Sequence, residues 1–182
     1  LLEKCEEFGV SIESIKNFTP FFAMNMLAIF QMQKIGFTPQ GVDAYYFAKA
    51  NQDRKKTGFL ESVEFQMKLL YDLGIKMGDE YILQGINEMD KTEAVMSPMI
   101  EEWRSGDSKM INEMINKDMK NQFPNMYKMI FLDRNKAWLG AIEKYLATKD
   151  VEFIIVGLGH VYGDEGLLKS LSDKGYKVEY LK

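Results

Sequence analysis

The chain has 182 residues and a formal net charge of -4. This acidic balance argues against binding to nucleic acid, which needs a clustered excess of lysine and arginine. This length is enough for one domain with a sizeable core. A single cysteine, Cys5, excludes an internal disulfide and a cysteine-based metal site, and no apolar run is long enough to predict a membrane-spanning helix.

The N-terminal part of the sequence predicts helices that begin at capping residues. Thr19-Pro20 combines an N-cap residue with a first-turn proline, which predicts a helix to about Ile35. A second Thr-Pro pair, at residues 38–39, repeats the pattern and predicts a helix to about Asn51. Glycine follows the first of these helices directly, as expected of a helix end.

A short strand and a long helical section follow. Residues 59–60 predict a strand that leads directly into an amphipathic helix ending at Gly74. Residues 79–149 predict helix throughout, interrupted at Ser97-Pro98, Ser105-Gly106-Asp107 and Phe123-Pro124. Eight of the 13 methionines lie between Met89 and Met129, which favours a helical core; the alternative is an adaptable groove for a peptide or a lipid.

The C-terminal residues predict a strand–helix–strand unit, which implies a parallel pair of strands. Residues 151–157 are β-branched and aromatic, residues 164–174 predict a helix that Gly175 ends, and residues 176–181 predict a last strand. We therefore expect a helix-rich α/β fold with a mixed or parallel sheet. The helical section, about residues 11–149, would be a large insertion before the unit at about 151–182.

His160 is the only histidine and follows the predicted strand 151–157 in the run Gly157-Leu158-Gly159-His160. Ligands of open α/β sheets bind outside the carboxyl ends of the strands, and glycine lets the backbone approach a ligand closely. His160, with Gly157 and Gly159 beside it, is therefore a candidate site residue. The alternative is a turn that needs glycine, in which His160 only caps or packs.

Glu61 takes the matching place after the predicted strand 59–60, so its carboxylate could face the same crevice. The alternative is a first-turn charge that the helix macrodipole favours. Two weaker candidates for a substrate pocket are Asp43, one turn into the second predicted helix, and Gln66, one turn beyond Glu61. The alternative for Asp43 and Gln66 is a side chain that faces solvent.

Arg134 falls on the apolar stripe of the predicted helix 124–147, because the steps 127, 131, 134 and 138 place it on the face of Phe131 and Trp138. Asn135 lies at the border of this stripe. A buried arginine is costly unless it is paired. Arg134 therefore predicts an acidic partner, a metal-bound carboxylate or an anionic transition state; a structural ion pair, with Glu61 for example, is the alternative.

Three blocks of the sequence together resemble the TraB/PrgY/GumN family, which is related to the Tiki metalloproteases. The C-terminal block resembles the family's G-x-x-H motif, glycine-rich helix start and G-Y-x-V strand. The two upstream blocks resemble its G-x-D and leucine–glutamate blocks and its arginine–asparagine pair. The matching residues are Phe153 to His160, Gly163, Gly166-Leu167, Leu171 and Gly175-Tyr176-Lys177-Val178, then Gly41-Val42-Asp43, Gly58-Phe59-Leu60-Glu61 and Gln66, and Arg134-Asn135.

The resemblance implies a metal-dependent hydrolase that acts on a peptide or another small-molecule substrate. By this resemblance His160 would be a metal ligand or catalytic base, Glu61 a ligand or general base, and Arg134 and Asn135 would stabilise an oxyanion. The metal would be manganese, cobalt or zinc, which polarises a carbonyl and activates water. The alternative within the family is a non-catalytic protein that binds or sequesters a peptide such as a pheromone.

The family's first G-x-x-H motif and its strand are not found in this sequence. We therefore expect the chain to be the C-terminal part of a single domain, spanning residues 1–182, that needs an N-terminal segment of the same protein as its partner. The chain alone would then be inactive, since one histidine and one glutamate are too few ligands for a metal. A second copy of the chain is a further candidate partner, and the resemblance suggests an exported or membrane-associated bacterial protein.

Overall fold

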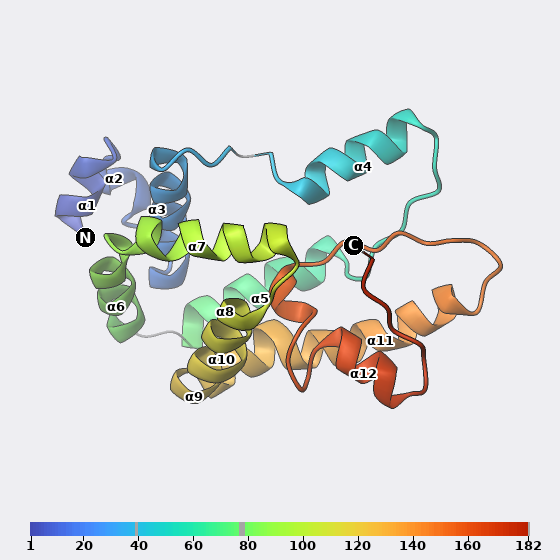
Figure 1. The fold of residues 1–182 in the computed structure, drawn as a ribbon. Coiled ribbons are helices and arrows are strands. Elements are labelled where there is room, and N and C mark those ends of the chain that lie inside the picture. The colour runs from blue at the N-terminus through green and yellow to red at the C-terminus, as the bar shows by residue number, and fades with distance from the viewer. Residues whose placement is uncertain (39, 77–78, 182) are drawn as a thin grey trace. The chain divides into compact units, whose positions relative to one another are not determined.

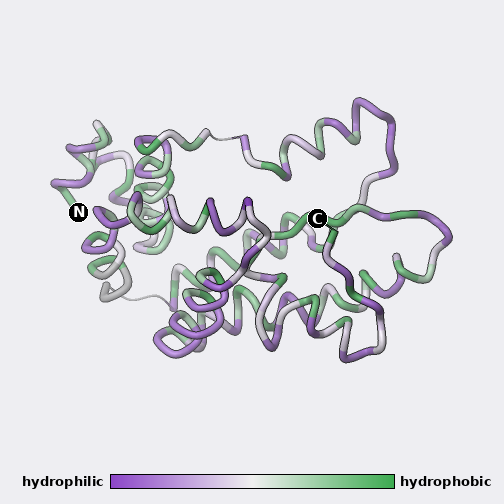
Figure 2. The backbone as a smooth tube through the Cα atoms, viewed as in Figure 1, coloured by the Kyte–Doolittle hydropathy of each residue, from purple (hydrophilic) through white to green (hydrophobic). Residues whose placement is uncertain are grey.

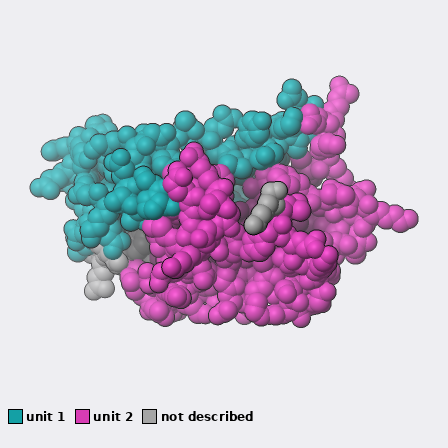
Figure 3. All heavy atoms as spheres, viewed as in Figure 1, with its two compact units in different colours: residues 1–52, 63–98 teal, residues 53–62, 99–182 magenta. Residues whose placement is uncertain are grey.

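The computed structural model describes residues 1–38, 40–76 and 79–181, and within them it contains helices, turns and loops but no strand (Figure 1). The residues group into two compact units, residues 1–52 with 63–98 and residues 53–62 with 99–182 (Figure 3). Four of the candidate site residues belong to the second unit: Glu61, Arg134, Asn135 and His160. In the part of the chain that the structure describes, no helix is both long and apolar enough to span a membrane.

The first unit is built on helix α3, which begins where the sequence predicts. The Thr19 hydroxyl accepts a hydrogen bond from the Phe22 amide at 3.3 Å, Pro20 occupies the first turn, and Gly36 follows the helix end with φ +96°. The helices are α1 (Leu2–Glu7), α2 (Ile12–Ile15), α3 (Pro20–Lys34), α4 (Val42–Gln52), α5 (Val63–Lys76), α6 (Asp79–Met89) and the first half of α7 (Thr92–Ser105), whose residues from 99 on belong to the second unit.

Burial of apolar side chains from α1, α2, α3 and α6 stabilises this unit. Its core contains Cys5, Ile15, Ala23, Met24, Leu27 and Met89. A methyl group at Gly74 of α5 would lie 2.7 Å from the Thr19 hydroxyl, and one at Gly85 of α6 would lie 2.9 Å from Met24 Cε. Helices α5 and α6 therefore pack closely on α3 because glycine stands at these two positions.

Two helix boundaries in the first unit differ from the predictions. Helix α4 begins at Val42, not directly after the second Thr-Pro pair; of that pair, Thr38 donates to the Gln40 carbonyl, and Pro39 lies outside the described residues. The interruption predicted at Ser97-Pro98 is also wrong, because α7 continues through Pro98.

The second unit is a chain of short helical segments followed by one long helix. They are α8 (Lys109–Ile111), the π-helical η1 (Asn112–Met119), α9 (Lys120–Gln122), α10 (Pro124–Tyr127), the π-helical η2 (Lys128–Leu132), α11 (Asp133–Leu146), the 3-10 turn η3 (Leu158–His160) and α12 (Leu167–Asp173). Before α8, the Asp107 carboxylate accepts hydrogen bonds from the Ser108 amide at 2.6 Å and the Lys109 amide at 3.2 Å. The core packs α11 against α12 through Trp138, Ile142 and Leu167.

The expected α/β fold is wrong: in the described ranges neither residues 59–60, nor 151–157, nor 176–181 form a strand. Five of the six residues 151–156 are hydrophobic (Figure 2), yet Val151 is fully exposed and Phe153 is 73% exposed. β-propensity reflects packing against neighbouring strands, so an apolar run forms a strand only where a hydrogen-bonded neighbour exists. The predicted helix 164–174 does form, shortened to α12.

Candidate functional site

The turn at residues 157–166, between the irregular segment 151–156 and α12, carries His160. A methyl group at Gly159 would lie 2.6 Å from both Ile115 Cδ1 and Phe131 Cε1, so this glycine lets the turn lie directly on η1 and η2. Gly163 has φ +90°, and a methyl group there would lie 2.3 Å from the Asn116 amide nitrogen. Close packing therefore requires glycine at position 159, and close packing together with the positive φ requires it at position 163.

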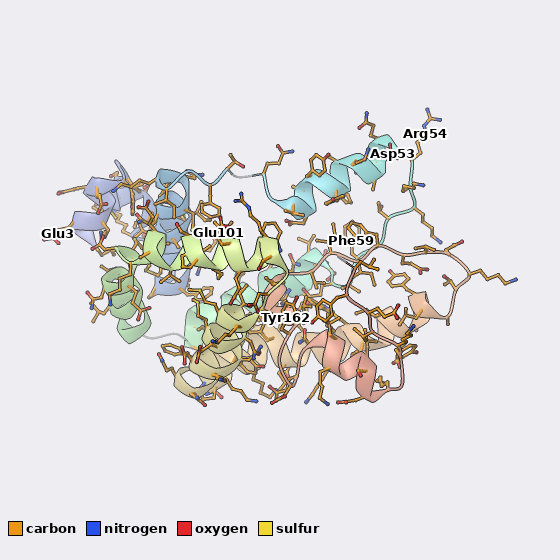
Figure 4. All side chains as sticks on the ribbon, in the orientation of Figure 1. Glu3, Asp53, Arg54, Phe59, Glu101 and Tyr162 are labelled. Carbon is orange, nitrogen blue, oxygen red and sulfur yellow. The ribbon has the colours of Figure 1, made fainter. Side chains whose placement is uncertain are left out.

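Two asparagine side chains hold the backbone of this turn. Asn116, on η1, donates to the carbonyl of Tyr162 at 3.1 Å; Tyr162 is labelled in Figure 4. Asn135, on α11, donates to the carbonyls of His160 at 3.3 Å and Glu165 at 2.9 Å. The orientation of His160 is thereby fixed from two helical segments that are separate in sequence.

Arg134 and Glu61 form a partly buried two-point ion pair. Arg134 Nε donates to Glu61 Oε1 at 2.7 Å and Nη2 donates to Oε2 at 3.0 Å. The side chains are 16% and 7% exposed, respectively. Trp138 Nε1 adds a third hydrogen bond to Glu61 Oε1 at 2.8 Å, and the guanidinium carbon lies 4.8 Å from the centre of the Trp138 ring. Charge-assisted, bidentate pairs of this kind are among the strongest protein hydrogen bonds.

The hydrogen-bond partners of His160 determine its tautomer. Arg134 Nη1 lies 3.2 Å from His160 Nε2, and a guanidinium can only donate, so Nε2 must accept. Asn135 Oδ1 lies 2.7 Å from Nδ1; because the amide nitrogen of Asn135 already donates to two carbonyls, Oδ1 accepts and Nδ1 carries the proton. The imidazole is therefore neutral, and its one lone pair is bound to Arg134.

Burial favours this neutral state further. His160 packs between Phe131 and Trp138, with ring centres 5.0 Å and 4.4 Å away. Burial and then the Arg134 charge lower the pKa of His160 from 6.5 to about 4, against a smaller opposing effect of Glu61. His160 is therefore uncharged throughout the physiological pH range.

The structure brings the four strongest sequence candidates, Glu61, Arg134, Asn135 and His160, into one hydrogen-bonded group, which we call the Arg134 cluster. Arg134 has Glu61 as its acidic partner, which is the structural ion pair given as the alternative; contact of Arg134 with a metal-bound carboxylate or an anionic transition state stays a prediction. The catalytic roles of these residues stay predictions. Asp43, in the first turn of α4, and Gln66, in α5, are exposed and belong to the first unit, so their assignment to a substrate pocket stays a prediction.

Trp138 donates a hydrogen bond to Glu61 of the Arg134 cluster, a role that sequence reasoning missed. It was placed on the apolar stripe only as a core residue, although a buried indole N–H usually requires an acceptor. Its position four residues after Arg134, on the same helix face, was the available signal. Phe131, whose ring contacts His160, was assigned to the stripe correctly.

A small polar hollow borders the same turn. Its volume is about 100 Å³, and its lining includes Asn116, Lys120, Tyr127 and Glu165. Tyr127 donates to Asn116 Oδ1 at 3.0 Å, and Lys120 lies 2.9 Å from Glu165. Burial, followed by the nearby Glu165 carboxylate, raises the pKa of Tyr127, so its hydroxyl stays protonated as a donor. The pair of Lys120 and Glu165 joins the turn to α9.

The donor set around Arg134 does not fit a metal ion by itself. It contains one imidazole nitrogen and one carboxylate, and both already accept hydrogen bonds from the guanidinium. Among residues that the structure describes, no group of three or more His, Cys, Asp or Glu side chains could hold a metal. A cation at this position would need further ligands and would have to displace Arg134, whose positive charge repels it.

The model of the TraB/PrgY/gumN family matches residues 1–180 of the chain. Comparison with curated proteins and with solved structures gives no match. The family match includes all four residues of the Arg134 cluster that the sequence predicted, and the turn that carries His160.

Proposed function

Because the chain belongs to the TraB/PrgY/gumN family, we propose that it carries the charge-stabilising and proton-transferring part of a hydrolytic centre that acts on peptides. One observation supports this proposal above the others. Residues that are up to 99 positions apart, Glu61 to His160, meet in a buried cluster that pairs a neutral imidazole with a fixed guanidinium. A neutral base beside a positioned cation is the arrangement that acyl transfer to water needs.

The proposed chemistry begins when the oxygen of a substrate carbonyl replaces His160 Nε2 as an acceptor of the hydrogen bond from Arg134 Nη1, while Glu61 keeps the guanidinium in place. The Nε2 lone pair is then free to accept a proton. His160 then takes a proton from water as the water oxygen attacks the carbonyl carbon. Arg134 holds the resulting oxyanion, and His160 returns the proton to the amine nitrogen as the C–N bond breaks.

Glu61 and Asn135 act as positioning residues in this scheme. Both oxygens of Glu61 accept hydrogen bonds from Arg134, which fixes the plane of the guanidinium. Asn135 Oδ1 holds the Nδ1 proton of His160, so that Nε2 is the nitrogen available as base. This differs from the role of ligand or general base that the family resemblance implies for Glu61.

The described residues do not provide the ligands that the metal-dependent form of the hypothesis needs. The non-catalytic alternative, a peptide-binding protein, has one observation in its favour. Helix α4 has no buried residue and exposes Val42, Tyr45, Tyr46 and Phe47. Exposed apolar surface of this kind often marks an interaction site.

Incubation with a mixed peptide library, followed by mass spectrometry, tests the proposal. We expect cleavage that falls about 100- to 1,000-fold in Arg134→Lys, which keeps the charge but loses the two-point geometry, and in His160→Gln. Lys136→Gln, an exposed change on the same helix, is the control. Parallel reactions receive manganese, cobalt or zinc; cleavage that requires one of these metals together with His160 would restore the metal hypothesis. Binding of peptides without cleavage would favour the non-catalytic alternative.

A further inference from the structure

The two glycines of the run Gly157-Leu158-Gly159-His160 differ in whether packing requires the absence of a side chain. Gly159 is buried, and a methyl group there would collide with Ile115 and Phe131 at 2.6 Å. Gly157 is exposed and has φ -58° and ψ 139°, a conformation that any residue adopts. A methyl group at Gly157 would meet, among the described residues within 4 Å, only Cδ2 of His160, at an ordinary contact distance of 3.7 Å.

Neither backbone conformation nor packing therefore requires glycine at position 157. Its missing side chain has one consequence on the described surface: it leaves space directly beside the His160 ring. Cδ2 is the ring atom bonded to Nε2, the nitrogen whose lone pair faces Arg134. The space at Gly157 thus borders the reactive edge of a ring that is otherwise buried, with His160 only 5% exposed.

We propose that Gly157 keeps open the approach from solvent to the Nε2 edge of His160, and that the peptide backbone of a substrate passes over this glycine. The absence of a side chain lets another backbone come close, which is the use of glycine beside ligands. A backbone amide that lay there would meet Nε2 and Arg134 Nη1 together. This proposal rests on the proposed function for the identity of the substrate, but not for the open approach itself.

The accessibility of the Nε2 edge of His160 from solvent can be measured without any substrate. The chain has a single histidine and hence one histidine Hδ2 signal by NMR. The probe is a neutral nitroxide dissolved in the buffer, which broadens the signals of protons that it can approach. We expect strong broadening of Hδ2 in the wild type, less in Gly157→Ala and least in Gly157→Val. Broadening that is equal in all three proteins would overturn the proposal.

Folding of the variants is checked by thermal unfolding. Gly157→Ala should melt at the wild-type temperature or slightly above it, since its backbone conformation is allowed and the unfolded chain loses freedom. Gly159→Ala should melt lower. Gly157→Ala melting as low as Gly159→Ala would show that position 157 needs glycine for structure, and would also overturn the proposal.

Cleavage of the peptide library provides the functional readout. In Gly157→Val we expect kcat/KM to fall by about tenfold or more while the fold is kept, as for other small displacements of a substrate. Wild-type cleavage rates in this variant would contradict passage of the substrate over Gly157. If the wild type itself cleaves no peptide, the proposed function fails, and the nitroxide measurement alone then decides whether the approach is open.

Discussion

The Arg134 guanidinium contacts both oxygens of Glu61 with two hydrogen bonds, of 2.7 Å and 3.0 Å, although the residues are 73 positions apart. The same side chain also donates to the Ile130 carbonyl and to His160. Arg134 therefore joins the loop before α5, the long helix α11 and the turn that carries His160. The stability of the second unit and the chemistry proposed for it depend on the same side chain.

Breaking this ion pair should destabilise the protein strongly. Arg134→Met leaves the Glu61 carboxylate buried with only the Trp138 donor, and we expect the free energy of unfolding in urea to fall by about 3–5 kcal/mol. Glu61→Met should cost a similar amount. The double variant should lose much less than the sum of the two, since a pair of apolar side chains leaves no uncompensated charge. Additive losses would show that the two residues do not interact.

The indole N–H of Trp138 should contribute through its hydrogen bond to Glu61 Oε1. Trp138→Phe keeps an aromatic ring but removes this donor to a charged group, so urea unfolding should show a loss of about 1.5–3 kcal/mol. The other tryptophan, Trp103, is 49% exposed and provides the matched control. Trp103→Phe should change stability by no more than about 0.5 kcal/mol; equal effects at both positions would argue against the hydrogen bond.

The single histidine should titrate far below its ordinary range. NMR of the folded chain should give a pKa of His160 near 4, since burial and the Arg134 charge disfavour the imidazolium. In Arg134→Gln the pKa should rise, but stay below 6.5 because burial is the larger cause. Lys136→Gln, which removes a positive charge from an exposed position of α11, should leave it unchanged. A wild-type value at or above 6.5 would contradict the neutral, Arg134-bound imidazole.

The same shift makes stability depend on pH. The unfolded chain takes up the histidine proton near pH 6.5, and the folded chain only near pH 4. The contribution of His160 is therefore fully present above about pH 6.5 and is lost as the pH falls toward 4. Unfolding in urea should show a larger loss between pH 7 and pH 4.5 for the wild type than for His160→Gln. Equal losses would exclude His160 as the cause.

Alanine substitutions should show which glycines the fold requires, by their effect on the stability of the protein. Gly163 has φ +90° and lies against Asn116, so Gly163→Ala should lower the thermal unfolding temperature. Gly140 lies inside α11, and a methyl group there meets nothing described within 4 Å. Gly140→Ala should therefore stabilise the chain by about 0.5–1 kcal/mol. Stabilisation by both substitutions would contradict the turn geometry described here.

Sequence reasoning found Arg134 and His160 because each broke a local pattern. Arg134 is a charge on an apolar stripe, His160 is the sole histidine beside two glycines, and helical periodicity needs only local sequence to be recognised. The strands were predicted wrongly because strand formation depends on a neighbouring strand, which local propensity does not reveal. The continuation of α7 through Pro98 and the π-helical turns of η1 and η2 were missed for a similar reason, since packing decides them.

The most direct test of the central claim is the incorporation of ¹⁸O from labelled water during peptide cleavage by the purified chain. If the Arg134 cluster delivers water to a peptide carbonyl, each new carboxyl group should carry one ¹⁸O atom, and the labelled products should form about 100- to 1,000-fold more slowly in both Arg134→Lys and His160→Gln. Folding of both variants is verified by their unfolding curves. Labelled products that persist at the wild-type rate in these variants, or a wild type that yields none, would contradict the account.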